Sequence, residues 1–200
     1  MHPEDTAARY DRIARWWQTH HQDSLYGIAQ LERAIKFASK KHFAIDIGCG
    51  SSGRFVKVLS EYGFQVEGLD ISAEMIDLAK QLHPDITFYR EDICCWSPPK
   101  SYSLVVAWDS TFHLPLDRQE FVVKKLCDAL EGHGVLMFTC GGGYKQSEVS
   151  GTFQGQNFEY STLGVNAFLK ILNEQHCTCL HLEYDQYPEN HVYIIAQKLD

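Results

Sequence analysis

The chain has no excess of basic residues. Its 200 residues include 18 Lys and Arg against 26 Asp and Glu, a formal net charge of -8. Broad binding to DNA or RNA depends on neutralising phosphates with basic side chains, so we expect no nucleic-acid partner. The sequence also lacks a run of about 18 apolar residues and a basic start followed by an apolar stretch. We therefore expect a cytoplasmic protein with no membrane association.

Paired cysteine motifs, internal repeats and low-complexity tracts are also missing. The seven cysteines form no pair of Cys-x-x-Cys units, and most lie in apolar patterns where cysteine behaves as a small hydrophobic residue. Adjacent Cys94 and Cys95 are poorly placed to bond to each other. We predict a reducing compartment and no metal site. The length and the 44% hydrophobic content suit one domain with a substantial core.

From Phe43 onward, short apolar runs alternate with amphipathic stretches. The strand-like runs cover residues 43–47, 65–69, 86–89, 103–108, 135–140, 177–184 and 191–197. Helical spacing between most of them indicates βαβ crossovers and a parallel sheet, whereas the short link at 186–190 suits a hairpin. We predict an α/β, Rossmann-like, seven-stranded sheet that is mostly parallel, with an antiparallel last strand and helices on both faces.

We expect these elements to form a single domain over residues 1–200. Its parts are an N-terminal helical cap (1–41), a core (42–140), an irregular insertion (141–163), and a helix followed by the strand hairpin (164–200). The insertion is rich in Gly, Ser and Gln, so a mobile loop or a pair of short strands would fit it.

Several polar residues stand where they could begin helices. Asp5 is placed to cap the first helix, and a second helix is expected from about 25 to 39. Ser72 is placed to cap a third. Asp117 and Glu120 have the spacing of a capping box.

The strongest local signal is the run Ile45-Asp46-Ile47-Gly48-Cys49-Gly50-Ser51-Ser52-Gly53, where a strand gives way to a helix. Glycines there let the backbone turn tightly and let a ligand approach the main chain. With Asp70 at the end of the next strand, the glycine spacing also matches a dinucleotide-binding fingerprint. Asp46 favours a different ligand, because a carboxylate repels a pyrophosphate but attracts an ammonium or a sulfonium.

The run from Phe43 to Lys80 resembles the first two motifs of class I S-adenosylmethionine-dependent methyltransferases. The first is Ile-Asp-Ile-Gly-Cys-Gly, and the second runs from Val66 through Asp70 to Ser72, with Met75, Ile76 and Ala79 following. Later segments, 90–93, 102–109 and 130–136, resemble the next motifs of that family in order. The sequence departs from the usual Gly-x-Gly-x-Gly, because Ser52 occupies the third glycine position and Gly53 comes one residue later.

The resemblance implies S-adenosylmethionine as cofactor and S-adenosylhomocysteine as product. The residues that it assigns to cofactor binding are Asp46, Gly48, Cys49, Gly50, Gly53, Asp70, Ile71, Met75, Asp92, Ile93 and Trp108. Asp46 would orient the methionine ammonium, Asp70 would hold the ribose, and Asp92 would accept from the adenine amino group.

The acceptor side of the site is less readable. His113 is a candidate general base because its ordinary pKa lies near neutrality, but a packed histidine beside Pro115 fits as well. Tyr10, Trp16, Asp109 and Tyr160 are candidates for the substrate pocket or its cap.

We expect methyl transfer to an O, N, S or C atom of a small-molecule acceptor. The alternatives are methylation of a protein side chain, a nicotinamide-dependent oxidoreductase, and a non-catalytic protein that binds S-adenosylmethionine.

Overall fold

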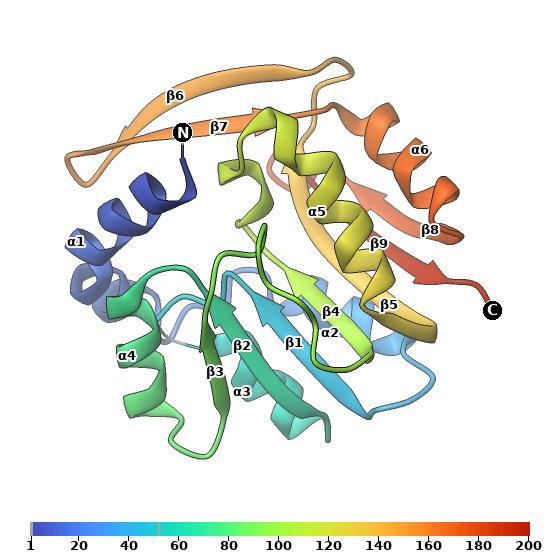
Figure 1. Cartoon of the computed structure of the whole chain (residues 1–200), viewed down its shortest axis with the longest axis horizontal. Helices are drawn as coiled ribbons and strands as arrows, with labels where there is room; N and C mark the ends of the chain where they lie inside the picture. Colours follow the sequence, from blue (N-terminus) through green and yellow to red (C-terminus); the bar gives the residue numbers. More distant parts are fainter. Residues whose placement is uncertain (1, 52) are drawn as a thin grey trace.

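The computed structural model describes residues 2–51 and 53–200, so the prediction for Ser52 lies outside the described residues. In chain order the elements are α1 (Pro3–His21), α2 (Ile28–Phe37), β1 (Phe43–Ile47), α3 (Arg54–Glu61), β2 (Gln65–Asp70), α4 (Ala73–Leu82), β3 (Thr87–Arg90), β4 (Tyr102–Ala107), the 3-10 turn η1 (Thr111–His113), α5 (Leu116–Asp128), β5 (Leu130–Gly141), β6 (Ser147–Phe153), β7 (Gln156–Thr162), α6 (Val165–Glu174), β8 (Cys177–Glu183) and β9 (His191–Lys198). Figure 1 shows their arrangement.

Seven strands form one sheet in the order β3-β2-β1-β4-β5-β9-β8. The first five in that order pair in parallel, and β9 runs antiparallel to both β5 and β8. The predicted mostly parallel sheet with an antiparallel last strand is therefore confirmed. Since β1, β2 and β4 are neighbours, the residues that follow them meet at one edge of the sheet.

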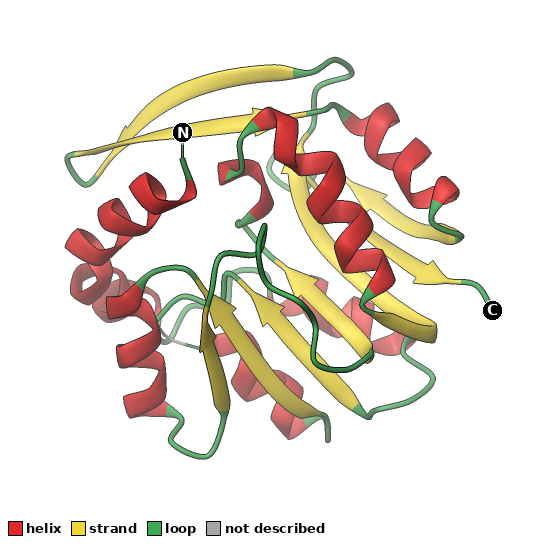
Figure 2. Cartoon of the chain, in the orientation of Figure 1, coloured by secondary structure: helices red, strands yellow, loops and turns green. Residues whose placement is uncertain are grey.

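Helices cover both faces of this sheet, as predicted (Figure 2). On one face α2, α3 and α4 pack against alternate strand residues, with Leu31, Leu59 and Ile76 in a shared core. On the other face α5 and α6 bury Leu126 and Phe168 in a second core. Strands covered on both sides read as continuous apolar runs, because neither face meets water. Tyr102–Ala107 is buried at every position.

The segment 141–163 contains a two-stranded antiparallel hairpin, β6–β7, so the paired-strand alternative for the insertion is correct. The hairpin lies with α1 beyond the carboxyl ends of the parallel strands (Figure 1). The two elements touch through Arg9, which donates to the carbonyl of Asn157, and Arg12, whose Nη1 lies 3.0 Å from Gln156 Oε1. Together they roof the edge of the sheet where the predicted site residues converge.

The structure corrects the predicted start of the first helix. Asp5 does not cap it, because α1 begins at Pro3 with His2 as the N-cap residue. Proline suits the first helical position, since its φ is preset and it has no N–H to leave unpaired. Asp5 instead lies in the first turn, where its charge favours the helix dipole.

Two other predicted helix starts are also displaced. The second helix begins at Ile28 rather than near Leu25, whose side chain is 81% exposed. The Asp117 capping box is wrong: Pro115 is the N-cap of α5, which places Asp117 one residue inside the helix. By contrast, the Ser72 cap is confirmed, since its Oγ accepts from the backbone N–H of Met75 at 3.2 Å.

Candidate functional site

A cavity of about 460 Å³ lies at the carboxyl edge of the parallel strands, beneath α1 and the β6–β7 hairpin. Open α/β sheets bind their ligands at this edge. The predicted site residues that line the cavity are Tyr10, Asp46, Gly48, Cys49, Gly50, Asp70, Ile71, Met75, Asp92, Ile93, Trp108, Asp109, His113 and Tyr160. Gly53 and Trp16 do not line it. Residues more than 100 positions apart in the sequence therefore line the same cavity.

Asp46 is the carboxylate at the floor of the cavity, on β1. It is 4% exposed, and burial raises its pKa to about 7; the charge of Arg54 lowers this value and that of Asp70 raises it further. A buried carboxylate of this kind is stabilised in its ionised form by a cation brought into the cavity. The site therefore presents a buried carboxylate suited to an ammonium.

Packing, as well as ligand access, explains why glycine occupies certain positions of the loop after β1. Gly48 has a φ of 77°, and a Cβ added there would lie 2.4 Å from Ser110 Cβ. Gly53 has a φ of 54°, and its Cβ would lie 2.8 Å from a ring carbon of His83. By contrast, a Cβ on Gly50 would have Trp17 Nε1 as its nearest neighbour, at 3.7 Å, so open space lies above that residue. Among the three glycines of this loop, Gly50 is the one over which a ligand has room.

Asp70, at the end of β2, ties the glycine loop to the sheet. Its Oδ2 accepts from the N–H of Gly50 at 2.9 Å, and its Oδ1 accepts from the N–H of Ser72 at 2.9 Å. Burial raises the pKa of Asp70, and hydrogen bonds from Ser72, Gly50 and Ile71 oppose that rise. Asp70 thus shapes the loop besides lining the cavity.

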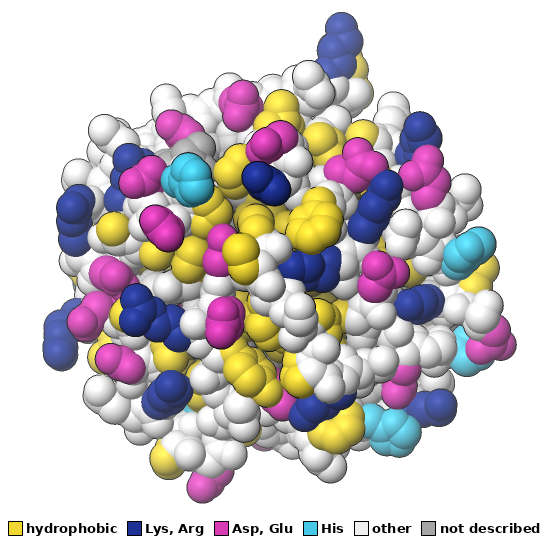
Figure 3. Space-filling view, in the orientation of Figure 1, with side chains coloured by type: hydrophobic (Ala, Val, Ile, Leu, Met, Phe, Trp, Pro, Cys, Tyr) yellow, Lys and Arg dark blue, Asp and Glu magenta, His cyan; other side chains and the backbone are white. Residues whose placement is uncertain are grey.

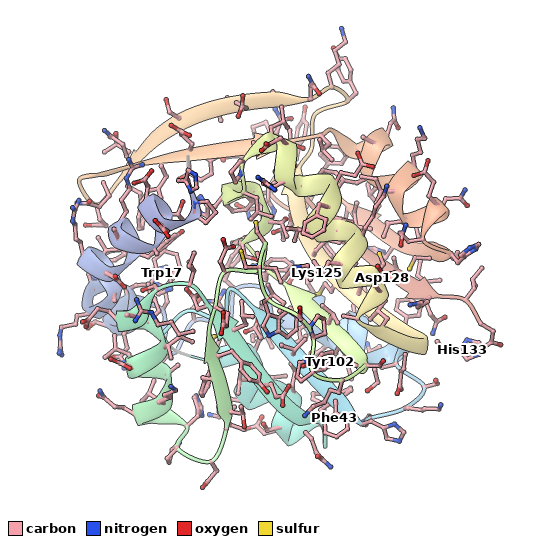
Figure 4. All side chains as sticks on the ribbon, viewed as in Figure 1. Trp17, Phe43, Tyr102, Lys125, Asp128 and His133 are labelled. Carbon is pink, nitrogen blue, oxygen red and sulfur yellow. The ribbon has the colours of Figure 1, made fainter. Side chains whose placement is uncertain are left out.

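The loop after β3 forms the third side of the cavity. Asp92 Oδ1 accepts from the N–H of Cys94 at 2.8 Å, which fixes the turn. Lys125 of α5 (labelled in Figure 4) holds the same loop from behind. Its Nζ lies 2.8 Å, 2.9 Å and 2.7 Å from the carbonyl oxygens of Ile93, Cys94 and Trp96. These three charge-assisted hydrogen bonds hold the loop in one conformation along the side of the cavity.

Arg54, which sequence reasoning missed, is a cation inside the cavity. It is the first residue of α3, and its guanidinium lies over the rings of Tyr26 and Phe55, 5.7 Å and 5.1 Å from their centres. Its Nε is buried and has no hydrogen-bond partner among the described residues. With Asp46 nearby, the site offers one anion and one cation, the pattern that matches an amino-acid zwitterion.

Asp109 follows β4 in the left-handed region, with φ at 51°, which non-glycine residues seldom adopt. His191 at the start of β9 bridges two carboxylates: Nε2 lies 2.9 Å from Asp109 Oδ1, and Nδ1 lies 2.6 Å from Asp185 Oδ1. Burial lowers the pKa of His191, but the hydrogen bonds and charges of both carboxylates outweigh that effect and raise it. Protonated His191 donates to both, so Asp109 is held in one orientation.

Sequence reasoning missed His191 and Asp185, along with Tyr26 and Gln186. Gln186 Nε2 donates to Tyr26 Oη at 2.5 Å, and that hydroxyl in turn interacts with Asp109. The sequence did offer one indication of Asp185, Gln186 and His191. The segment 184–191 connects the two strands of the predicted last hairpin, and this connection lies at the carboxyl edge of the sheet.

His113 lies at the end of η1 among aromatic rings. Its Nε2 is 2.8 Å from Tyr10 Oη, and its Nδ1 is 3.2 Å from the carbonyl oxygen of Glu159. Burial lowers the pKa of His113 to about 4, against smaller opposing effects of Glu159 and Asp109. The ring is therefore neutral near pH 7, donating to the carbonyl and accepting from Tyr10.

Of the two neighbouring tryptophans on α1, Trp17 lines the cavity and Trp16 does not. Trp17 shares a face with Tyr10, seven residues earlier, and its ring centre lies 5.8 Å from that of Tyr10. Trp16 instead stacks on His20, with ring centres 4.2 Å apart, and contacts Phe153 of the hairpin. Figure 4 shows Trp17 on α1.

Other kinds of site find less support. Within 2–51 and 53–200, no group of three or more His, Cys, Asp or Glu side chains is arranged to hold a metal ion. In the same ranges, no helix is both long enough and apolar enough to cross a membrane. Acidic and basic side chains are interspersed over the face drawn in Figure 3, with no broad basic patch on it.

Comparison with known proteins agrees with the geometry. A family model described as "Methyltransferase domain" matches residues 44–134, which run from the second residue of β1 into the start of β5 and include the glycine loop. Trans-aconitate 2-methyltransferase of Rhizobium etli is 32% identical over 94 residues, 46% of this chain and 36% of that protein. The match thus spans about a third of the length of this curated relative.

Two solved structures share the fold over almost the whole chain. The DhpI complex with S-adenosylhomocysteine superposes with a TM-score of 0.73 at 21% identity, covering 98% of this chain and 97% of DhpI. The 1,6-didemethyltoxoflavin-N1-methyltransferase of Burkholderia thailandensis, solved with its acceptor and S-adenosylhomocysteine, has a TM-score of 0.70 at 15% identity, covering 100% and 92%. With the motif order and the cavity, these matches identify a class I S-adenosylmethionine-dependent methyltransferase domain in this chain, and the family model covers residues 44–134 of it.

Proposed function

We propose that this protein transfers the methyl group of S-adenosylmethionine to a small-molecule acceptor. The observation that carries the proposal is the convergence of Asp46, Gly50, Asp70 and the 91–93 loop on one cavity at the carboxyl edge of the sheet. Two similar proteins support the acceptor class: one is a trans-aconitate methyltransferase, and the other is a methyltransferase of the same fold that was solved with bound 1,6-didemethyltoxoflavin.

The residues of the cavity fit this cofactor. Asp46 would take the ammonium of the methionine part. Arg54, whose Nε has no partner among the described residues, would take its carboxylate. The open space above Gly50 gives the chain of the cofactor room to pass. Asp70 would accept from the ribose hydroxyls, and Asp92 with Ile93 would bind the adenine edge. Bound there, the cofactor supplies an activated methyl carbon.

Most of what the protein contributes to such a reaction is positioning. Ordering the acceptor in line with the methyl carbon removes an entropic cost that dominates a two-molecule reaction. The roof formed by α1 and the β6–β7 hairpin would keep water from the reacting atoms.

We also propose a role for His113 in proton transfer. Its Nε2 accepts from Tyr10, so a proton leaving the acceptor would reach His113 through the Tyr10 hydroxyl. Burial leaves the imidazole unprotonated at neutral pH but also makes it a weak base, with a pKa of about 4, so it would hold that proton only transiently.

The proposal is tested by incubating the protein with S-adenosylmethionine carrying a labelled methyl group and a panel of small acceptors and peptides. Formation of S-adenosylhomocysteine and a labelled small molecule is the expected result. Label found only in peptides would reject a small-molecule acceptor. Release of no label, despite tight cofactor binding, would favour a non-catalytic binding protein.

A further inference from the structure

The cavity has a second part beside the residues assigned to the cofactor. Tyr10 of α1, Phe158 and Tyr160 of β7, and Phe112 and His113 of η1 surround it. The centre of the His113 ring lies 5.5 Å from that of Phe158 and 5.0 Å from that of Tyr160. Flat rings gathered in this way offer apolar surface and edge or face contacts to another ring.

One carboxylate faces this aromatic wall. Asp109 begins the segment that continues into Phe112 and His113, and its charge acts on both Tyr10 and His113. The side chain of Asp109 is 30% exposed, while Asp185 behind it is 4% exposed. The His191 bridge between the two therefore fixes Asp109 where a ligand in the cavity can reach it.

The charged side chains around the cavity disfavour binding of an anionic ligand. Of the described residues that line it, five are acidic (Asp46, Asp70, Glu91, Asp92 and Asp109) and Arg54 is the basic one. His191 adds a positive charge when it is protonated, but both its nitrogens are committed to carboxylates. A carboxylate or phosphate on the acceptor would therefore meet net repulsion.

Trp108, the residue before Asp109, contributes another polar group to the cavity. The indole N–H of Trp108 is buried, lines the cavity and has no hydrogen-bond acceptor among the described residues. Trp108 is 5% exposed, so water does not easily satisfy this donor. An oxygen or nitrogen lone pair of a bound molecule would satisfy it.

We propose that the acceptor is a flat aromatic compound without a carboxylate or phosphate, carrying a hydroxyl or amino group that donates to Asp109. Its ring would lie against Tyr10, Phe158 and Tyr160. This inference rests on the proposed function and narrows its acceptor. It also separates this chain from its trans-aconitate-methylating relative, since the acceptor named for that enzyme is a polycarboxylate.

The test uses two probes that share a ring and differ by one carboxylate: catechol and 3,4-dihydroxybenzoate. Each is titrated calorimetrically into protein saturated with S-adenosylhomocysteine. We expect catechol to bind at least about tenfold more tightly, the effect of one unfavourable charge contact in a partly buried site. Trans-aconitate, used as a third probe, should not bind.

Three variants connect that preference to the named residues. Asp109→Asn should bring the two affinities to within about threefold of each other, because one negative charge is removed. Tyr160→Ala should weaken catechol binding about tenfold by removing ring contacts. Glu148→Gln on exposed β6 removes a negative charge of the same hairpin outside the cavity and should change neither affinity.

The outcomes separate this inference from the proposed function. If S-adenosylhomocysteine fails to bind the native protein, the proposed function fails and the acceptor site with it. If S-adenosylhomocysteine binds but neither phenol does, or the benzoate or trans-aconitate binds as well as catechol, the acceptor assignment alone is overturned. An unchanged preference in Asp109→Asn would remove Asp109 from the acceptor site.

Discussion

Asp46 should make cofactor binding depend on pH. Its pKa is about 7 because it is buried, and an ammonium binds well only to its ionised form. With that pKa, about one molecule in eleven is ionised at pH 6 and about ten in eleven at pH 8. The affinity for S-adenosylhomocysteine should therefore rise about tenfold between these pH values, because binding holds Asp46 ionised and releases its proton.

The assay is calorimetric titration at pH 6, 7 and 8, repeated at pH 7 in buffers with different heats of ionisation. About half a proton should be released per S-adenosylhomocysteine bound at pH 7, since about half of Asp46 is protonated there. Asp46→Asn is the matched control, and it should bind more weakly with little dependence on pH. An affinity in the native protein that is flat or falls with pH, or the same rise in Asp46→Asn, would refute the assignment of Asp46 to the ammonium.

Three further substitutions test other parts of the site. Asp70→Ala should weaken S-adenosylhomocysteine binding by about 2–4 kcal/mol and lower the melting temperature, because its carboxylate also holds two backbone N–H groups; unchanged affinity would exclude the ribose role. His113→Ala should lower turnover more than cofactor affinity in steady-state kinetics, and equal effects on both would mean that His113 only packs against Tyr10. Lys125→Met should weaken S-adenosylhomocysteine binding about tenfold by loosening the 93–96 loop, whereas native-like affinity would show that the loop holds its shape without it.

The sheet could be predicted from local sequence patterns. Apolar runs mark the strands, and glycine and acidic residues follow them within a few positions in the chain. Asp46 and Asp70 could be placed at one edge, since each ends or precedes the end of a parallel strand. On α1 the sequence prediction named Tyr10 and Trp16, whereas Tyr10 and Trp17 are the pair that lines the cavity. Trp16, one residue away, points about 100° around the helix and so lies outside the cavity.

Other features depend on contacts that a single segment does not encode. Asp5 and Asp117 look like caps, but a proline close to each sets the helix start instead. The bridge from Asp109 through His191 to Asp185 joins positions up to 82 residues apart, so it appears only when the last hairpin folds against β5. The same holds for Arg54, whose place in the cavity depends on where α3 begins.

The most direct test of the central claim is parallel calorimetric titration of the purified protein with S-adenosylmethionine, S-adenosylhomocysteine and NADH. We expect micromolar binding of the first two ligands and none of the third. Selective binding of NADH would contradict it, and would mean that the glycine loop cradles a pyrophosphate instead of an amino-acid chain.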